Sequence, residues 1–493
     1  MKNVFLLMLF IILEINANFL HFQFIRSLQS QSTNSYDYSS YTATSTNTNL
    51  NDQTLTSSTS DQSVVYITQS GITITSSTLQ KTGGDSSEIE NSEFYGVNAA
   101  VLVNGGGVTI TDGEITTAAK GANAVCATNN GVVTISGTTI SSTAESSGRG
   151  LHATYGGSIT ASKVTISSTG GSCATLATDR GEGTVTCTDC TLSTAGAGSP
   201  LIYSTGTISI SGTTGTSSGA QMVVVEGRNT ATVENSSLKC TGVGNRNNVD
   251  KSGIMLYQSM SGDADSGTST FNCKSSTMEV LSSSSVYDSA PMFFITNTEA
   301  SINLENCTFT YGSGVFLDAE GTSAWGTSGS NGGTVTLKLT NQNIEGDFVI
   351  DSSSTLAVTM VNSTMKGTIN NSKNSATISI TLDSASNIIL TGNSYISSLN
   401  NADSTGSNIV KGSYSFEDYN GNAYTATGSE SSEATTTSPS TTSAPTTPSL
   451  TTTPVSSSGN DNNSTYDHWI RVNSNNYISY SILLCLINIL LLN

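Results

Sequence analysis

Charged and aromatic residues are scarce in this chain of 493 residues. They make up 11% and 6% of the sequence, and 36 acidic residues against 17 basic ones give a formal net charge of −19. So few basic residues cannot neutralise a run of phosphates, which argues against nucleic acid as a partner. They also leave no basic patch for an anionic membrane surface. A long polar chain of this composition must build its core from small repeated units.

Histidine and cysteine are also rare, which excludes several catalytic and metal chemistries. The sequence has no GHG segment of the kind found in polygalacturonase-like hydrolases, and its three histidines are His21, His152 and His468. The pair Cys187 and Cys190 has no second pair for zinc and no βαβ context for a redox centre. We interpret the pair as small apolar fillers or a local bridge, and we expect no metal and no cofactor.

The N-terminal part carries the pattern of an export signal. Residues 1–17 contain a basic Lys2, an apolar run over 4–13 and the small residue Ala17. This pattern predicts a secretory signal peptide, with a buried N-terminal helix as the alternative. Residues 18–62 are polar and repetitive, and we expect them to form a disordered low-complexity segment.

The C-terminal part predicts a stalk and a membrane anchor. Residues 426–465 are rich in Ser and Thr with interspersed Pro, as in O-glycosylated stalks. Residues 466–493 form a polar spacer and an apolar tail, which predicts a GPI-anchor signal with Asn463 or Ser458 as the attachment residue. A plain transmembrane anchor is the alternative. Both interpretations predict an anchor in the membrane and a location at the cell surface, on the extracellular leaflet of the plasma membrane.

Between residues 63 and 425 a short apolar pattern recurs about every 25 residues. Each repeat holds three apolar segments with alternating side chains, such as 100–103, 108–110 and 114–115. Three short strands per repeat without a helical period predict one coil of a parallel β-helix. The predicted fold is therefore all-β, a single-stranded right-handed parallel β-helix solenoid of about ten to eleven coils, with residues 242–253 and 319–333 as loops. An array of antiparallel β-sandwiches is the alternative.

The same region resembles a known class of proteins. The stretches NAAVLVNGGGVTITDGEITT, RGLHATYGGSITA and MLYQSMSGDADSGTSTF are similar to secreted adhesin-like right-handed parallel β-helix proteins, which are mostly uncharacterised. The resemblance covers most of residues 71–416. It implies a pectate-lyase-like solenoid on a cell surface, and it brings no established activity.

Polar and aromatic residues recur where the first apolar segment of successive repeats ends. On adjacent coils they would line one side of the solenoid, where rings can stack on sugars and polar groups can hold hydroxyls. The predicted ligand-binding residues are Tyr155, Asp179, Arg180, Glu182, Tyr203, Glu226, Arg228, Tyr257 and Gln258. Asp179 and Glu226 are the candidate acid and base of a polysaccharide lyase or hydrolase. Plain salt bridges between coils are the alternative role of these charges.

Three further patterns bear on surface chemistry. Sequons for N-glycosylation occur at Asn235, Asn306, Asn362, Asn370, Asn462 and Asn463. Asp263 and Asp265, in SGDADSG, resemble a Ca²⁺-binding turn. Thr-x-Thr segments raise the hypothesis of ice binding, but Ser, Asn, Cys and variable loops break the rows and argue against it.

Taken together, these patterns predict a cell-surface anchored β-helix glycoprotein for adhesion or carbohydrate recognition. Its expected partner is an extracellular glycan or another cell surface. Two alternatives remain open. One is a polysaccharide-degrading enzyme of pectate-lyase-like fold, and the other is a structural surface-coat glycoprotein without a specific ligand.

Overall fold

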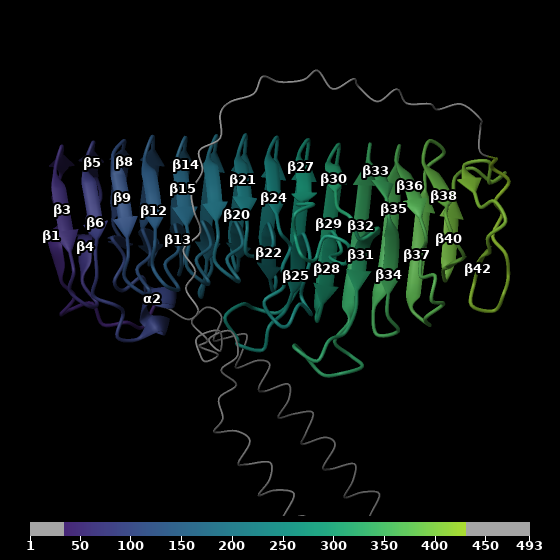
Figure 1. Cartoon of the computed structure of the whole chain (residues 1–493), viewed down its shortest axis with the longest axis horizontal. Helices are drawn as coiled ribbons and strands as arrows, with labels where there is room; N and C mark the ends of the chain where they lie inside the picture. Colours follow the sequence, from purple (N-terminus) through teal and green to yellow (C-terminus); the bar gives the residue numbers. More distant parts are fainter. Residues whose placement is uncertain (1–33, 430–493) are drawn as a thin grey trace, which may run out of the picture. The chain divides into compact units, whose positions relative to one another are not determined.

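Short parallel strands dominate the structure, a computed structural model that describes residues 34–429 (Figure 1). The predicted signal peptide, most of the predicted stalk and the predicted anchor signal lie outside these residues. Strands that neighbour one another in a sheet run parallel, as β10 with β13 and β11 with β14. Neighbours in each sheet come from successive coils, which is the topology of a parallel β-helix.

The first sheet has twelve strands. They are β1 (Ala43–Thr46), β4 (Ser63–Ile67), β7 (Val101–Asn104), β10 (Val125–Thr128), β13 (Leu151–Ala153), β16 (Leu176–Thr178), β19 (Ile202–Ser204), β22 (Val223–Glu226), β25 (Ile254–Tyr257), β28 (Phe293–Thr296), β31 (Val315–Ala319) and β34 (Asp347–Ile350).

The second sheet is the longest, with fourteen strands. They are β2 (Leu50–Asn51), β5 (Ile72–Thr75), β8 (Gly107–Thr111), β11 (Val132–Ser136), β14 (Gly157–Ser162), β17 (Gly183–Thr188), β20 (Thr207–Ser211), β23 (Thr230–Glu234), β26 (Thr268–Lys274), β29 (Thr298–Glu305), β32 (Gly333–Thr340), β35 (Thr355–Val361), β37 (Thr377–Leu382) and β40 (Ser398–Asn401).

The third sheet has ten strands and is followed, after a break, by a four-stranded sheet and a two-stranded one. The ten strands are β3 (Thr54–Ser57), β6 (Thr78–Lys81), β9 (Glu114–Thr117), β12 (Thr139–Ser142), β15 (Thr165–Ser168), β18 (Thr191–Thr194), β21 (Thr214–Ser217), β24 (Ser237–Cys240), β27 (Thr277–Val280) and β30 (Thr308–Thr310). The smaller sheets contain β33 (Asn343–Glu345), β36 (Thr364–Gly367), β38 (Asn387–Leu390) and β41 (Ile409–Val410), then β39 (Ser394–Tyr395) and β42 (Phe416–Glu417).

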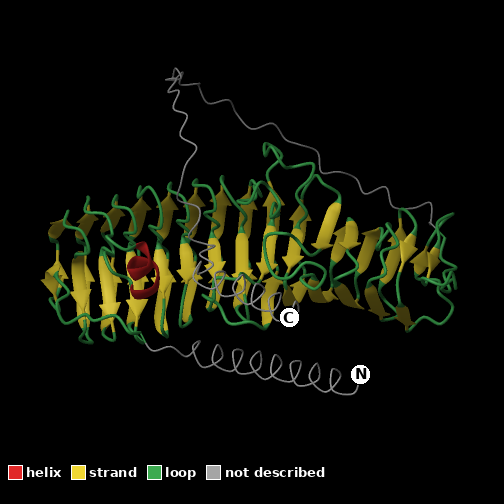
Figure 2. Cartoon of the chain, turned by 90° about the horizontal axis from the view of Figure 1, so that it is seen from below, coloured by secondary structure: helices red, strands yellow, loops and turns green. Residues whose placement is uncertain are grey.

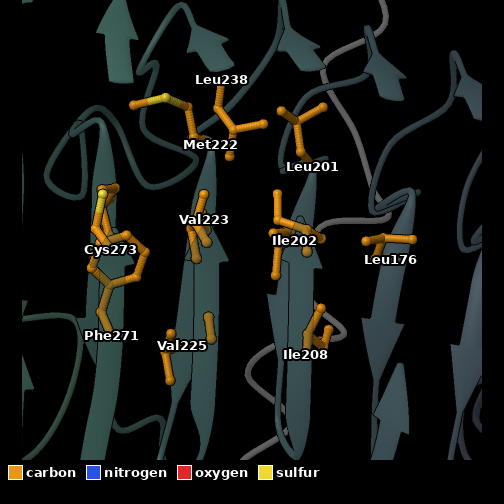
Figure 3. Packing of buried hydrophobic residues seen from close by; sticks show 14 of the residues in the cluster. Leu176, Leu201, Ile202, Ile208, Met222, Val223, Val225, Leu238, Phe271 and Cys273 are labelled. Atoms are coloured by element: carbon orange, nitrogen blue, oxygen red, sulfur yellow. The ribbon is translucent and has the colours of Figure 1, made fainter. Parts of the chain in front are cut away.

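The core consists of apolar side chains that stack coil upon coil inside the solenoid. Because side chains alternate along a strand, every second residue points inward. In the first sheet the register places Leu176 on Ile202 and Ile202 on Val223, and all three side chains are buried. Figure 3 shows this row together with Ile208 and Phe271 of the second sheet, which belong to the same core cluster. The outward residues of the second and third sheets are mostly Thr, Ser and Asn.

The turn between the second and third sheets recurs with left-handed backbone geometry. Asp112, Asp189, Asn235 and Asn306 occupy it, and Asn362 occupies the corresponding turn before the four-stranded sheet, all with φ between 46° and 58°. Asn and Asp tolerate this conformation better than other side chains, which explains their recurrence in the sequence. The turn therefore places three of the predicted sequon asparagines on the same edge of the solenoid.

The structure confirms the fold class and corrects its extent. The second sheet has fourteen strands, more than the predicted ten or eleven coils. The predicted disordered segment 18–62 contains β1, β2 and β3, so the first coil begins at Ala43. Its strands are Thr- and Ser-rich because the terminal coil of a solenoid has one face open to water, and such a coil needs fewer apolar residues.

Two local features add to the predicted strands. A short helix, α2 (Ile89–Tyr95), lies over the strands (Figure 2) and ends at Gly96, whose φ of 73° suits glycine. The segments 241–253 and 320–332 form loops, as predicted. Among the described residues no helix is long and apolar enough to cross a membrane.

Candidate functional site

The predicted ligand-binding residues lie around the outer side of the first sheet, but not in one column. Tyr203 in β19 aligns with Val224, whereas Tyr257 in β25 aligns with Glu226. Tyr155 follows β13, and its backbone N–H donates to the carbonyl of Arg180 at 3.1 Å. The three tyrosines therefore occupy different register positions and do not stack in one column.

Two of these tyrosines converge on one carboxylate. The hydroxyls of Tyr203 and Tyr257 donate to Oε2 of Glu226 at 2.6 Å and 2.7 Å. All three side chains are buried, and Glu226 has no exposed surface. Burial raises the pKa of Glu226, because water no longer solvates its charge, and the two tyrosine donors oppose this rise. The two tyrosines and Glu226 therefore form a buried cluster that is hydrogen-bonded through Oε2 of Glu226.

Asp179 lies in a second buried cluster. The Arg149 guanidinium is 3.2 Å from Asp179 and 3.5 Å from Glu93 of α2, and its side chain is 2% exposed. Burial raises the pKa of Asp179, and Arg149 opposes the rise. The sequence did not predict the contact between Glu93 and Arg149, because these residues are 56 positions apart in the chain. The signal that could have found them is an Arg between two glycines in a repeat with almost no charge.

The remaining charged residues form ion pairs that hold a loop in place. Arg180 pairs with Asp263, and Arg228 pairs with Asp265 at 2.7 Å and with Glu182 at 3.0 Å. Both aspartates belong to the loop after β25, so their carboxylates are already neutralised by arginine. Among the described residues no group of three or more His, Cys, Asp or Glu could hold a metal ion.

The outer side of the first sheet is covered by α2 and by the loops after β25 and β31. Three aromatic contacts and one side-chain amide hold these segments in place. Arg180 lies over the ring of Phe94 in α2, 3.7 Å from its centroid. The neighbouring Tyr95 stacks on Tyr155 with ring centroids 5.7 Å apart. Trp325, from the loop after β31, packs edge-on against Tyr257.

Gln258 belongs to this cover too, since its side-chain amide donates to the carbonyl of Ala264 at 3.1 Å within the loop. The side of the solenoid where these residues were predicted to bind a ligand is thus covered by α2 and by the loops after β25 and β31. The alternative reading of these charges, as salt bridges between coils, is the one the structure supports.

Asp179 and Glu226 do not have the accessibility that a catalytic pair needs. A glycosidase requires both carboxyl groups beside the scissile bond of a bound sugar. Here Asp179 is 3% exposed and paired with Arg149, and Glu226 is fully buried. His152 is equally closed, with Nδ1 3.7 Å from Sγ of Cys126, and burial lowers its pKa well below the usual value. Asp179, Glu226 and His152 are therefore packed inside the protein, beneath the segments that cover the first sheet.

Residues 63–238 match the family model of the right-handed β-helix region. The chain is a right-handed parallel β-helix protein. The comparisons with curated proteins and with solved structures found no match. The family match and the long parallel sheets confirm the fold that the resemblance to pectate-lyase-like β-helix proteins implies.

The β-helix leaves a different surface open, the outer side of β5, β8, β11, β14, β17 and β20. Two columns of hydroxyl side chains run along it, one residue per coil in register. The first column is Thr73, Thr109, Thr134, Thr160, Thr186 and Ser209, and the second is Thr75, Thr111, Ser136, Ser162, Thr188 and Ser211. All twelve are exposed or half-buried. We call these two columns the hydroxyl face.

The hydroxyl face corrects the sequence analysis on one point. The cysteine in its middle, Cys187, points into the core and does not interrupt the columns. It forms a disulfide with Cys190, so the prediction of a local bridge is confirmed. A second disulfide joins Cys273 to Cys307.

The four predicted sequons within the described residues differ in exposure. Asn235 and Asn306 are exposed at the turn between the second and third sheets, and Asn362 is exposed at the corresponding turn between β35 and β36. Asn370 is 1% exposed, and its Nδ2 donates to the carbonyl of Asn374 and to the Tyr419 hydroxyl. The folded β-helix has no room for a glycan on Asn370. Asn462 and Asn463 lie outside the described residues, as does the predicted attachment residue Ser458.

Proposed function

We propose that this β-helix is an exported, membrane-anchored cell-surface glycoprotein that recognises carbohydrate through its hydroxyl face. The observation that carries the proposal is the two uncovered columns of hydroxyls in coil-by-coil register. Each hydroxyl can donate and accept a hydrogen bond, as each sugar hydroxyl can. The columns repeat every ~4.8 Å along the solenoid, and a polymer lying along them makes many weak contacts at once.

The predicted processing signals support the cell-surface location in this proposal. Residues 1–17 have the pattern of a secretory signal, and residues 466–493 have that of a GPI-anchor signal. A stalk over 426–465 would hold the β-helix away from the membrane. A multivalent polar face at that distance suits adhesion to an extended polysaccharide.

Recognition is favoured over cleavage because the candidate catalytic groups are enclosed. Asp179 is bonded to Arg149, and Glu226 accepts hydrogen bonds from two tyrosines under the loop after β25. A polymer could reach them only if α2 and that loop left the face. The hydroxyl face, in contrast, needs no rearrangement.

The experiment compares cells that display the full chain on surfaces coated with a panel of polysaccharides. The test variant replaces three hydroxyls of the hydroxyl face, Thr134→Val, Thr160→Val and Thr186→Val. Valine keeps the shape and the strand preference of threonine but removes the hydroxyl. Three lost hydrogen bonds at about 0.5–1.5 kcal/mol each predict at least a tenfold weaker retention of cells.

The matched control carries the same change on the third sheet. It replaces Thr139, Thr165 and Thr191, which are exposed and in register on β12, β15 and β18. We expect this control to bind like the parent chain. Equal loss in both variants would contradict recognition by the hydroxyl face. Retention on no polysaccharide would favour a structural coat instead.

A further inference from the structure

The third sheet is interrupted at one position. β30 and β33 lie on successive coils and do not pair, although β29 and β32 of the same coils pair along eight residues. The interruption opens a groove of about 580 Å³. This volume is within the usual range of sites for small ligands.

Side chains replace the missing strand pairing on both sides of the groove. The side-chain amide of Gln342 accepts from the Cys307 N–H at 2.8 Å and donates to the Cys307 carbonyl. It also donates to the Asn343 carbonyl at 3.1 Å, and the Tyr311 hydroxyl donates to the Glu345 carbonyl. Two carbonyls of β33 are therefore occupied. A peptide strand added here would have to displace both donors, so the groove does not suit strand addition.

The lining of the groove combines an apolar floor with a polar rim. Phe309 and Tyr311 are half-buried there, next to the buried Phe316. The rim carries the Asn343 amide and an ion pair in which Lys366 is 2.8 Å from Glu345. Aromatic rings offer a face to the C–H groups of a pyranose, and amides and charges bond its hydroxyls. The groove therefore fits one or a few sugar residues.

One of the predicted sequons lies on the rim of this groove. Asn306 lines the groove and is exposed in the left-handed turn, with Thr308 as the hydroxyl residue of its sequon. Among the described residues its side chain makes no hydrogen bond. The side chain of Asn362 differs, because its Nδ2 donates to Asn341 at 2.7 Å. Asn306 is thus the sequon asparagine whose amide stands free beside a sugar-sized groove.

We propose that Asn306 carries an N-linked glycan whose first sugar residues occupy the groove between β30 and β33 and cover Phe309 and Tyr311. The inference rests on export, which is part of the proposed function. The donor is an oligosaccharide on a lipid pyrophosphate. In the attachment step the bond from sugar C1 to Nδ2 forms, the bond from C1 to the pyrophosphate oxygen breaks, and Nδ2 loses one proton as the lipid pyrophosphate leaves.

The test uses the full chain made in cells that add N-linked glycans. Glycopeptide mass spectrometry measures the occupancy of each sequon, and the purified folded protein is then compared before and after enzymatic release of its glycans. Thr308→Ala removes the Asn306 sequon, whereas Thr308→Ser keeps it. Ser237→Ala removes the sequon at Asn235, which has the same turn but does not line the groove.

We expect Asn306 to be occupied in the parent chain and in Thr308→Ser. Loss of its glycan, by Thr308→Ala or by enzyme, should raise the binding of a hydrophobic dye several-fold and lower the melting midpoint by several degrees. Loss of the Asn235 glycan should change neither. An unoccupied Asn306 beside an occupied Asn235 would overturn the inference but leave export intact. An occupied Asn306 whose release changes nothing would also overturn it, while glycans on no sequon would contradict export as well.

Discussion

The role of Arg149 as the centre of a buried charge cluster gives the sharpest prediction. Its guanidinium lies between Asp179 and Glu93, and the three side chains are 2%, 4% and 10% exposed. Arg149→Met keeps most of the volume but leaves two carboxylates without a cation. Removing one partner of a buried ion pair costs about 3–5 kcal/mol. We expect the variant to unfold more easily by this amount above pH 8, where Asp179 of the parent is ionised.

The stability that Arg149→Met loses relative to the parent should grow as pH rises. The pKa of Asp179 is already raised in the folded chain, and loss of Arg149 raises it further. A carboxyl with a raised pKa contributes its stability below its unfolded pKa, and this contribution is lost as pH rises through the folded pKa. Burial raises the pKa of Asp179 to about 8 in the parent, so the variant should fall further behind the parent as pH rises through this value.

Thermal melting at pH values below and above 8 and hydrogen exchange over residues 89–95 measure the effect. Exchange is informative because α2 is bound to the solenoid through Glu93 and should open first. The double variant Arg149→Met with Asp179→Asn should recover part of the loss. Arg228→Met is the surface control and should cost at most about 1 kcal/mol, since its side chain is 48% exposed. A penalty that is the same at every pH would refute the reasoning.

Two further predictions concern the disulfide between coils and the membrane anchor. Cys273→Ser opens a loop closed over 34 residues and should cost about 3–4 kcal/mol in thermal or chemical unfolding, more than opening the Cys187–Cys190 bridge with its separation of 3. Equal losses from the two bridges would contradict this. A phosphatidylinositol-specific phospholipase should release the full chain from cells, and complete retention would favour a spanning helix over a lipid anchor.

The sequence predicted the fold because each coil repeats the same physical constraint. Inward Val, Ile and Leu recur at every second position, and Asn or Asp recurs at the left-handed turn, as at Asn235 and Asn306. The first coil, from β1 to β3, was missed because its strands contain few apolar residues. Leu50 of the first coil, for example, is surrounded by Thr, Ser and Asn.

The candidate site was predicted less well. The segments that cover it are held by contacts between distant residues, and the repeat pattern does not specify such contacts. The register places Glu226 beside Tyr257, but nothing local indicates that α2 and the loop after β25 close this face. Glu93 reaches Arg149 only once the solenoid has formed. The break between β30 and β33 is hidden in the same way, because Phe309 and Ile344 both fit the apolar pattern of the third sheet.

The break also has a mechanical consequence. A pull along the solenoid axis loads the backbone hydrogen bonds between neighbouring coils, and at most junctions three sheets share that load. Between β30 and β33 only the first two sheets carry it. Under tension this junction, like the junctions after β34 that also lack one sheet, should part before the junctions that three sheets hold.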